Sequence, residues 1–135
     1  MLNVTKNSPQ SAIRRSLGDW GERLAARHLV ALGYQIVTQG WRCRLGELDI
    51  IAVYEATLVI VEVRTRRGTA RGSAEESITP TKAHRLARLA LAYLDAREQA
   101  GDPWNGPYRI DVIAITLDAR GAVQTLNHLE SAVGE

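Results

Sequence analysis

Cysteine is almost absent from this 135-residue chain, whose one thiol belongs to Cys43. A single cysteine excludes an internal disulfide framework and any zinc site that needs several cysteines, and it suits a reducing cytosol. No apolar run reaches the roughly 18 residues needed to cross a bilayer. The polar segment 1–16 also lacks the apolar region of a signal peptide. We therefore expect a cytoplasmic protein with no membrane partner.

Strong net charge is also missing, because the formal net charge is only +2. No overall basic character therefore points to a partner. The cations are nearly all of one kind, since 15 of the 17 Lys and Arg residues are arginines. Arginine suits bidentate phosphate contacts, but a GC-rich coding sequence also enriches it, and composition alone favours that explanation. The length and the 45% of hydrophobic residues are those of one soluble globular domain.

The most informative stretch is 46–66, which predicts two strands, residues 47–54 and 57–65, around a short polar break at Glu55-Ala56. If the break is an even-length hairpin loop, directly paired residues have numbers that sum to 111. Asp49 then faces Glu62, and Glu47 faces Arg64. Three acids and one cation would share one face of the sheet. An odd-length loop or a bulge would instead flip the side chains of one strand to the other face.

The predicted hairpin is apolar on both faces, which indicates cover on both sides, as in the middle of an α/β sheet. The patch face continues with Ile51, Val53, Leu58 and Ile60, and the opposite face carries Leu48, Ile50, Ala52, Val59, Val61 and Val63. Acids opposed at one end of such a pair repel each other unless a proton or a cation lies between them. A divalent ion held by oxygen ligands is the economical solution.

The remaining chain predicts the order α-β-β-β-α-β-β, a three-layer α/β/α fold with a central mixed sheet. Ser16 and Asp19 resemble a capping box for a helix of about residues 17–32, which Gly33 ends. Thr79-Pro80 opens a second helix, about residues 80–99. The other elements are strands at 34–41, 108–117 and 122–129 and a loop at 66–77. We expect an N-terminal arm (1–15), one domain (16–130) and a C-terminal tail (131–135).

Several motifs together resemble the YraN-like family of small bacterial proteins, to which a PD-(D/E)XK nuclease, restriction-endonuclease-like fold is assigned. The motifs are Gly18-x-x-Gly21-Glu22, Gly33-Tyr34, Trp41-Arg42, Gly46-Glu47-Leu48-Asp49, Glu62-Val63-Arg64 and Arg109-Ile110-Asp111-Val112. The resemblance covers about residues 16–118. It departs from the nuclease motif at one position, where Arg64 replaces the usual lysine.

This resemblance implies a Mg²⁺- or Mn²⁺-dependent nuclease that cuts DNA, with branched or single-stranded DNA as candidate substrates. Asp49, Glu62 and the backbone carbonyl of Val63 would be the metal ligands. Arg64 would stabilise charge on the phosphorus but cannot act as a general base, because it keeps its proton. Glu47 would hold the Arg64 guanidinium in place. Glu22 either points towards the patch as a fourth catalytic residue or stabilises the helix dipole.

Nucleic-acid contacts are expected from loop arginines, although exposed arginines are often only solvated. The candidates are Arg42, Arg44, Arg66, Arg67 and Arg71. Arg109 and Asp111 share a strand face and are interpreted as a structural pair. The three histidines show no metal-ligand spacing.

Two other functional classes remain open at this point. The chain is also compatible with a non-catalytic nucleic-acid-binding module, which the arginine at position 64 favours, and with a protein-interaction scaffold. The presence of Glu22, Asp49 and Glu62 together favours the nuclease, because a pure binder has no use for an acidic site that repels phosphate. The sequence leaves the oligomeric state open, and a homodimer is one possibility.

Overall fold

The chain is described from a computed structural model, which places residues 9–68 and 72–134, with side chains from Leu17 onward. Two long helices, α1 (Pro9–Ala31) and α2 (Pro80–Gln99), accompany a short 3₁₀ helix, η2 (Glu75–Ser77). The strands are β1 (Gln35–Cys43), β2 (Gly46–Tyr54), β3 (Thr57–Arg67), β4 (Tyr108–Leu117) and β5 (Val123–Leu129). Within the described residues, no helix is both long and apolar enough to cross a membrane.

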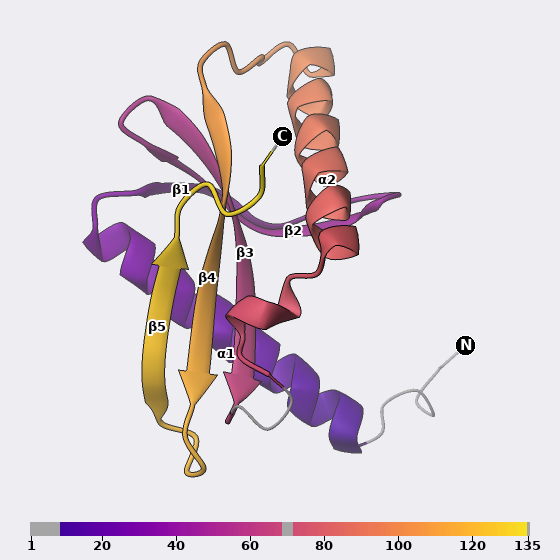
Figure 1. Cartoon of the computed structure of the whole chain (residues 1–135). Coiled ribbons are helices and arrows are strands. Elements are labelled where there is room, and N and C mark those ends of the chain that lie inside the picture. The colour runs from indigo at the N-terminus through magenta and orange to yellow at the C-terminus, as the bar shows by residue number, and fades with distance from the viewer. Residues whose placement is uncertain (1–8, 69–71, 135) are drawn as a thin grey trace.

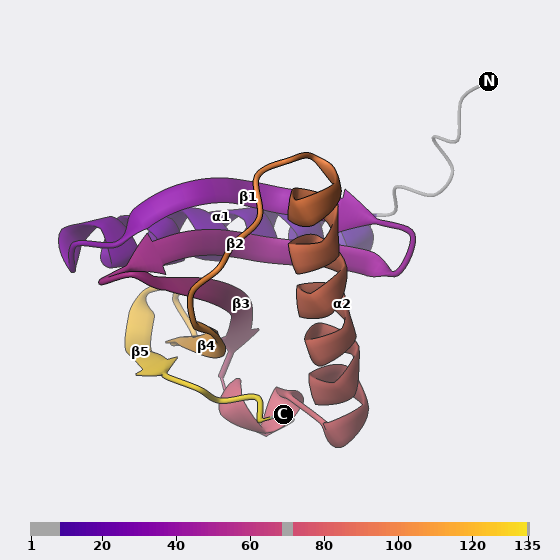
Figure 2. The same ribbon diagram turned by 90° about the horizontal axis from the view of Figure 1, so that it is seen from above.

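The five strands form one mixed sheet in the order β1-β2-β3-β4-β5 (Figure 1). Neighbours are antiparallel except β3 and β4, which run parallel and are joined through α2. A parallel pair needs such a crossover, because a tight turn cannot join its strands. Seen from above, α1 lies behind β1 and β2, and α2 lies in front of them (Figure 2). The predicted three-layer α/β/α architecture is therefore confirmed.

Each face of the sheet buries its own apolar cluster under one helix. Ala25 and Leu29 of α1 are fully buried in a cluster with residues of β2, β3 and β4. On the other face, Leu86 and Leu89 of α2 belong to a cluster with Ile51 and Ile60. The middle strands are thus covered on both sides, as their continuous apolar sequence predicts.

The hairpin between β2 and β3 has the predicted register. Tyr54 pairs with Thr57, and the four following pairs, up to Ile50 with Val61, keep the same sum of residue numbers. Glu55 and Ala56 have φ values of 50° and 68°, as the two central residues of a type I′ turn require. The even-length loop is therefore confirmed, and Asp49 and Glu62 follow directly after the last of these pairs.

The two helices meet the sequence predictions to different degrees. Helix α1 begins at Pro9, so Ser16 does not open it, and half of the segment expected as an arm is helical. Gly33, with a φ of 99°, ends α1 through bonds from the Gly33 and Tyr34 N–H groups to the carbonyls of Val30 and Leu29. Helix α2 begins as predicted, with the Thr79 hydroxyl accepting a hydrogen bond from the Lys82 N–H.

One apolar residue, Leu48, lies on the other face of the sheet than predicted. Leu48 joins the cluster under α2, although Ile50, two residues along the same strand, belongs to the cluster under α1. The strict alternation of faces along β2 therefore breaks at Asp49, which lies between them.

The segment 66–77 is less loop-like than predicted. Strand β3 continues to Arg67, and η2 follows the three residues that the structure does not describe. Ser73 and Glu76 form reciprocal bonds, from the Ser73 N–H to Glu76 Oε1 and from the Glu76 N–H to Ser73 Oγ. This is the geometry of a capping box, and it fixes the approach to α2.

The turn at Glu55-Ala56 generates a stability prediction. Both residues adopt a left-handed conformation, which glycine and asparagine tolerate better than glutamate and alanine. Replacing them by Asn-Gly should raise the free energy of unfolding by about 1 kcal/mol and the melting temperature by roughly 3–6 °C. Glu55→Gln, which removes the same charge without favouring the turn, should have no such effect in thermal denaturation. An unchanged or lower melting temperature for the Asn-Gly variant would contradict the turn assignment.

Candidate functional site

Three acidic side chains from three elements meet in one pocket of about 790 Å³. Glu22 comes from α1, Asp49 from β2 and Glu62 from β3, and all three line the pocket wall. The charge of Asp49 acts on both of the other acids and raises the pKa of Glu22 and of Glu62. Asp49 is therefore the central member of the group. Of the two interpretations of Glu22, its position favours the one in which it points towards the patch.

Asp49 is held where the β2–β3 ladder ends. The Val63 N–H donates to Asp49 Oδ2 at 2.9 Å, so a carboxylate takes the place of a strand carbonyl as its acceptor. Beyond this bond β3 continues beside β4, with Glu62 next to Val112 and Arg64 next to Ala114. The pocket lies where this pairing has ended, and it is lined by α1, by Asp49 and by the last part of β3.

Burial makes ionisation of these acids unfavourable. It raises the pKa of Glu62 to about 8, and the neighbouring charge of Asp49 adds to the shift. Burial also raises the pKa of Asp49, although the Val63 N–H opposes this. The pKa of Glu22 rises to about 7, again through burial first and then through the charges of Asp49 and Glu47. At neutral pH the group therefore retains protons that a cation would displace.

Arg64 lies beside the acids but is held differently from the prediction. Its Nη1 atom is 3.7 Å from Glu62 Oε2, and its Nε atom donates to Ser77 Oγ at 2.9 Å. Glu47 instead lies 3.6 Å from Arg42, its partner across β1 and β2. The predicted pairing of Glu47 with Arg64 is wrong, because the regular β2–β3 pairing on which it depends stops at Ile50 and Val61.

The predicted phosphate-binding arginines fall into three groups. Arg66 and Arg67 line the pocket with the acids. Arg42 and Arg44 lie at the turn between β1 and β2, on a separate shallow surface, where Arg42 is paired with Glu47. Arg71 lies outside the described residues. Of the five candidates, only Arg66 and Arg67 are placed by the structure at the acidic pocket.

A close contact between α1 and β3 positions Glu22. Gly21 packs against Thr65, and a Cβ atom at Gly21 would lie 2.1 Å from Thr65 Oγ1. Any larger residue would push the helix away from the strand, and with it the adjacent Glu22. The glycine of the Gly18-x-x-Gly21-Glu22 motif therefore has a steric role.

Side chains supply only part of the ligand set that a hard divalent cation needs. Asp49 and Glu62 offer carboxylate oxygens, the ligand type that Mg²⁺ and Mn²⁺ prefer. Among residues 9–68 and 72–134, no three His, Cys, Asp or Glu side chains converge on a single metal position. A third protein ligand would have to be a backbone oxygen, and the predicted Val63 carbonyl belongs to the residue whose N–H already binds Asp49.

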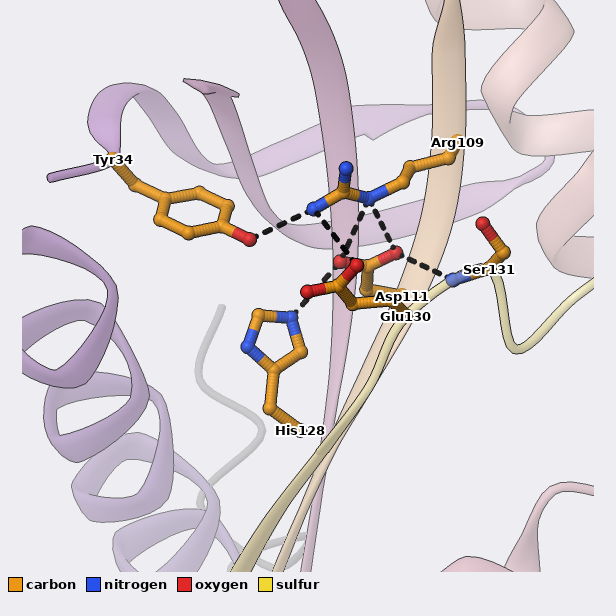
Figure 3. A network of polar contacts seen from close by, with 6 residues as sticks. All are labelled: Tyr34, Arg109, Asp111, His128, Glu130 and Ser131. Carbon is orange, nitrogen blue, oxygen red and sulfur yellow. Dashed lines mark hydrogen bonds and ion pairs between the residues drawn. The ribbon is translucent and has the colours of Figure 1, made fainter. Parts of the chain in front are cut away.

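A second polar cluster, away from the acids, has a structural role (Figure 3). Asp111 is fully buried, and both of its oxygens lie within 3.2 Å of Arg109 Nε. The Ser131 N–H and His128 Nε2 each lie 2.9 Å from an Asp111 oxygen. Arg109 also donates to the Tyr34 hydroxyl at 2.8 Å. The predicted Arg109–Asp111 pair is confirmed, and it joins β4 to β5 and to the start of β1.

Some important residues were not identifiable from the sequence. Ser77 was assigned to a loop, yet it is buried and holds Arg64. His128 was set aside for lack of metal-ligand spacing, yet it contacts Asp111 from β5. The tail residues Ser131 and Val133 pack against the start of β4. The Ser73-x-x-Glu76 spacing was the one signal that could have revealed the order around Ser77.

The raised pKa of Glu62 predicts how stability depends on pH without metal. Unfolded Glu62 ionises near pH 4.5, whereas folded Glu62 keeps its proton up to about pH 8. The folded state therefore binds more protons in this window, and the free energy of unfolding falls as pH rises. Glu62→Gln should flatten this slope and, at pH 8 in EDTA, raise the free energy of unfolding by about 2–4 kcal/mol.

The control for this prediction is Glu98→Gln, a change of the same chemistry at an exposed position of α2. It should leave the pH dependence of wild type intact in urea denaturation between pH 5 and pH 8. Equal slopes for wild type and Glu62→Gln would show that the Glu62 environment does not hold a proton.

Comparison with known proteins places the chain in a family. The profile of "Uncharacterised protein family UPF0102" matches residues 21–115, which include Glu22, Asp49 and Glu62. A UPF0102 protein from Herpetosiphon aurantiacus is 59% identical over 118 residues, covering 87% of this chain and 94% of its own length. One from Roseiflexus castenholzii is 48% identical over 122 residues, covering 90% and 96%. The chain is thus a member of the uncharacterised protein family UPF0102.

Proposed function

We propose that this protein is a divalent-metal-dependent nuclease that hydrolyses phosphodiester bonds in DNA, built on a restriction-endonuclease-like fold. The observation that carries the proposal is the meeting of Glu22, Asp49 and Glu62 in one pocket whose wall also carries Arg64 and Arg66. Partly buried acids that raise one another's pKa are unfavourable in their ionised form unless a cation compensates them. A site that binds a metal ion and a phosphodiester together needs acids to hold the metal and nearby cations to hold the phosphate.

Asp49, Glu62 and the Val63 carbonyl would hold Mg²⁺ or Mn²⁺, which supplies neutralisation of phosphate charge and activation of water. Arg64 is positioned to donate hydrogen bonds to a phosphate oxygen, because Ser77 and Glu62 fix its guanidinium at the pocket wall. Its constant charge can stabilise the extra negative charge of the transition state. It cannot take a proton from water, so that step falls to a carboxylate or to solvent. Glu22, on the α1 side of Asp49, is available to orient water.

A non-catalytic nucleic-acid-binding module is the second candidate. The observation that favours it is Arg64 itself, which stands where the nuclease motif has lysine and is already bound to Glu62 and Ser77. Such an arginine retains the attraction for phosphate and loses the ability to exchange a proton. The two functions therefore predict the same binding surface and differ in whether the bond is cut.

A digestion panel separates these candidates. Wild type should cut at least one of single-stranded, duplex, flapped or four-way DNA with Mg²⁺ or Mn²⁺ and should be inactive in EDTA. Asp49→Asn should abolish cleavage, whereas Asp95→Asn, on the exposed side of α2, should not. Arg64→Lys should preserve or raise the rate, and Arg64→Ala should lower it by about 10²–10³-fold.

The result that would reject the nuclease is equally specific. If neither wild type nor Arg64→Lys cuts any substrate, while both bind DNA with a steep salt dependence, the protein is a binding module. If there is neither cleavage nor binding, the acidic pocket serves a ligand other than nucleic acid.

A further inference from the structure

Three cations on α2 have no evident role in stabilising the fold. Lys82, Arg85 and Arg88 follow one another at intervals of three residues, so neighbouring members repel each other on the helix surface. Lys82 lies in the first turn, where the helix dipole disfavours positive charge, and that turn contains no acid. No carboxylate of the described residues forms an ion pair with any of the three. We call these three residues the basic strip.

The basic strip begins near Arg64, because Arg64 Nε donates to Ser77 Oγ at 2.9 Å and α2 begins three residues after Ser77. The positive charge of Arg64, and after it burial and the charge of Arg66, lower the pKa of Lys82. Arg85 is close enough to Glu62 for its charge to oppose the rise of the Glu62 pKa. The first turn of α2 therefore lies beside Arg64, and the strip starts at this edge of the pocket.

Along the helix the strip leads away from the pocket over exposed surface. Lys82 is half-buried, whereas Arg85 and Arg88 are exposed. The buried residues of α2, among them Leu86 and Leu89, pack against the sheet and leave the strip free for a ligand. An acidic pocket repels phosphate, so a polyanion needs a nearby row of cations to bring its backbone to the acids.

We infer that Lys82, Arg85 and Arg88 are the track on which the phosphate backbone of the nucleic acid continues from the acidic pocket across α2. The inference rests on the proposed function and adds the direction in which the substrate leaves the site. Successive phosphates would contact successive cations, which removes the repulsion among them. Because phosphate contacts carry no base information, the track would bind without sequence preference.

The test compares two triple variants with the same change in charge. One carries Lys82→Gln, Arg85→Gln and Arg88→Gln, and its control carries Arg23→Gln, Arg27→Gln and Arg120→Gln, at exposed positions outside the strip. Binding to labelled single-stranded and duplex oligonucleotides is measured by fluorescence anisotropy, with Ca²⁺ in place of Mg²⁺, over a range of salt. The strip variant should bind at least about tenfold more weakly, and its slope of log K against log salt should be smaller in magnitude by about 2 on single strands and about 3 on duplex DNA. The control should keep the wild-type slope.

The melting temperature of the strip variant excludes a folding defect. It should equal or exceed that of wild type, because neutralisation removes like-charge pairs and an unfavourable dipole contact. A clear fall would show that the cations stabilise the fold and would overturn the inference. Equal loss of binding in both triple variants would also overturn it, because net charge alone would then explain the effect.

The remaining outcomes separate the track from the nuclease. Wild type that binds through the strip but cuts nothing would support the track and reject catalysis. If the strip variant cuts DNA as fast as wild type and binds it equally well, the track is rejected but the nuclease is not. Absence of oligonucleotide binding by wild type would reject both. Competition by polyglutamate as strong as that by unlabelled oligonucleotide would assign the strip to an acidic protein and overturn the inference.

Discussion

The hydrogen bond from the Val63 N–H to Asp49 Oδ2 is the interaction on which the site depends. It lies where the backbone ladder between β2 and β3 ends, so a side chain replaces the strand carbonyl that would otherwise accept. The bond fixes one carboxylate of the group at the end of the paired ladder, at the wall of the pocket. Glu22 and Glu62 then meet Asp49 from either side.

The three-layer architecture makes ionisation of these acids unfavourable. Helices on both faces keep water from the middle strands, and the acids at the end of the hairpin are partly buried. Burial raises their pKa values, and the charges of neighbouring acids raise those of Glu22 and Glu62 further. The surrounding cations are on the pocket wall and on α2, with Arg64 held by Ser77 at the junction. Separate positive and negative surfaces at one site suit a ligand that combines a metal ion with a polyanion.

The sequence predicted the fold and the Asp49–Glu62 contact because both follow from local rules. Runs of β-branched and aliphatic residues predicted the strands of the hairpin, and a two-residue turn set its register. The same arithmetic failed for Glu47 and Arg64, because it assumes that regular pairing continues well beyond Ile50 and Val61. Ser77 and His128 were missed because their partners are distant in sequence, and only tertiary packing brings them to Arg64 and Asp111. The start of α1 at Pro9 was missed because a capping-box spacing at Ser16 also fits the interior of a helix.

The central claim is that the partly buried acids around Asp49 form a cation site, and proton release on metal binding tests it most directly. Titration calorimetry with Mn²⁺ at pH 7, repeated in buffers of different ionisation enthalpy, measures binding and released protons together. We predict that wild type and Asp95→Asn bind Mn²⁺ with release of about one proton, because the ion displaces protons held by acids whose pKa values are raised. Asp49→Asn should lose this binding. Binding of Mn²⁺ by Asp49→Asn as tight as that by wild type, or binding without proton release, would contradict the account.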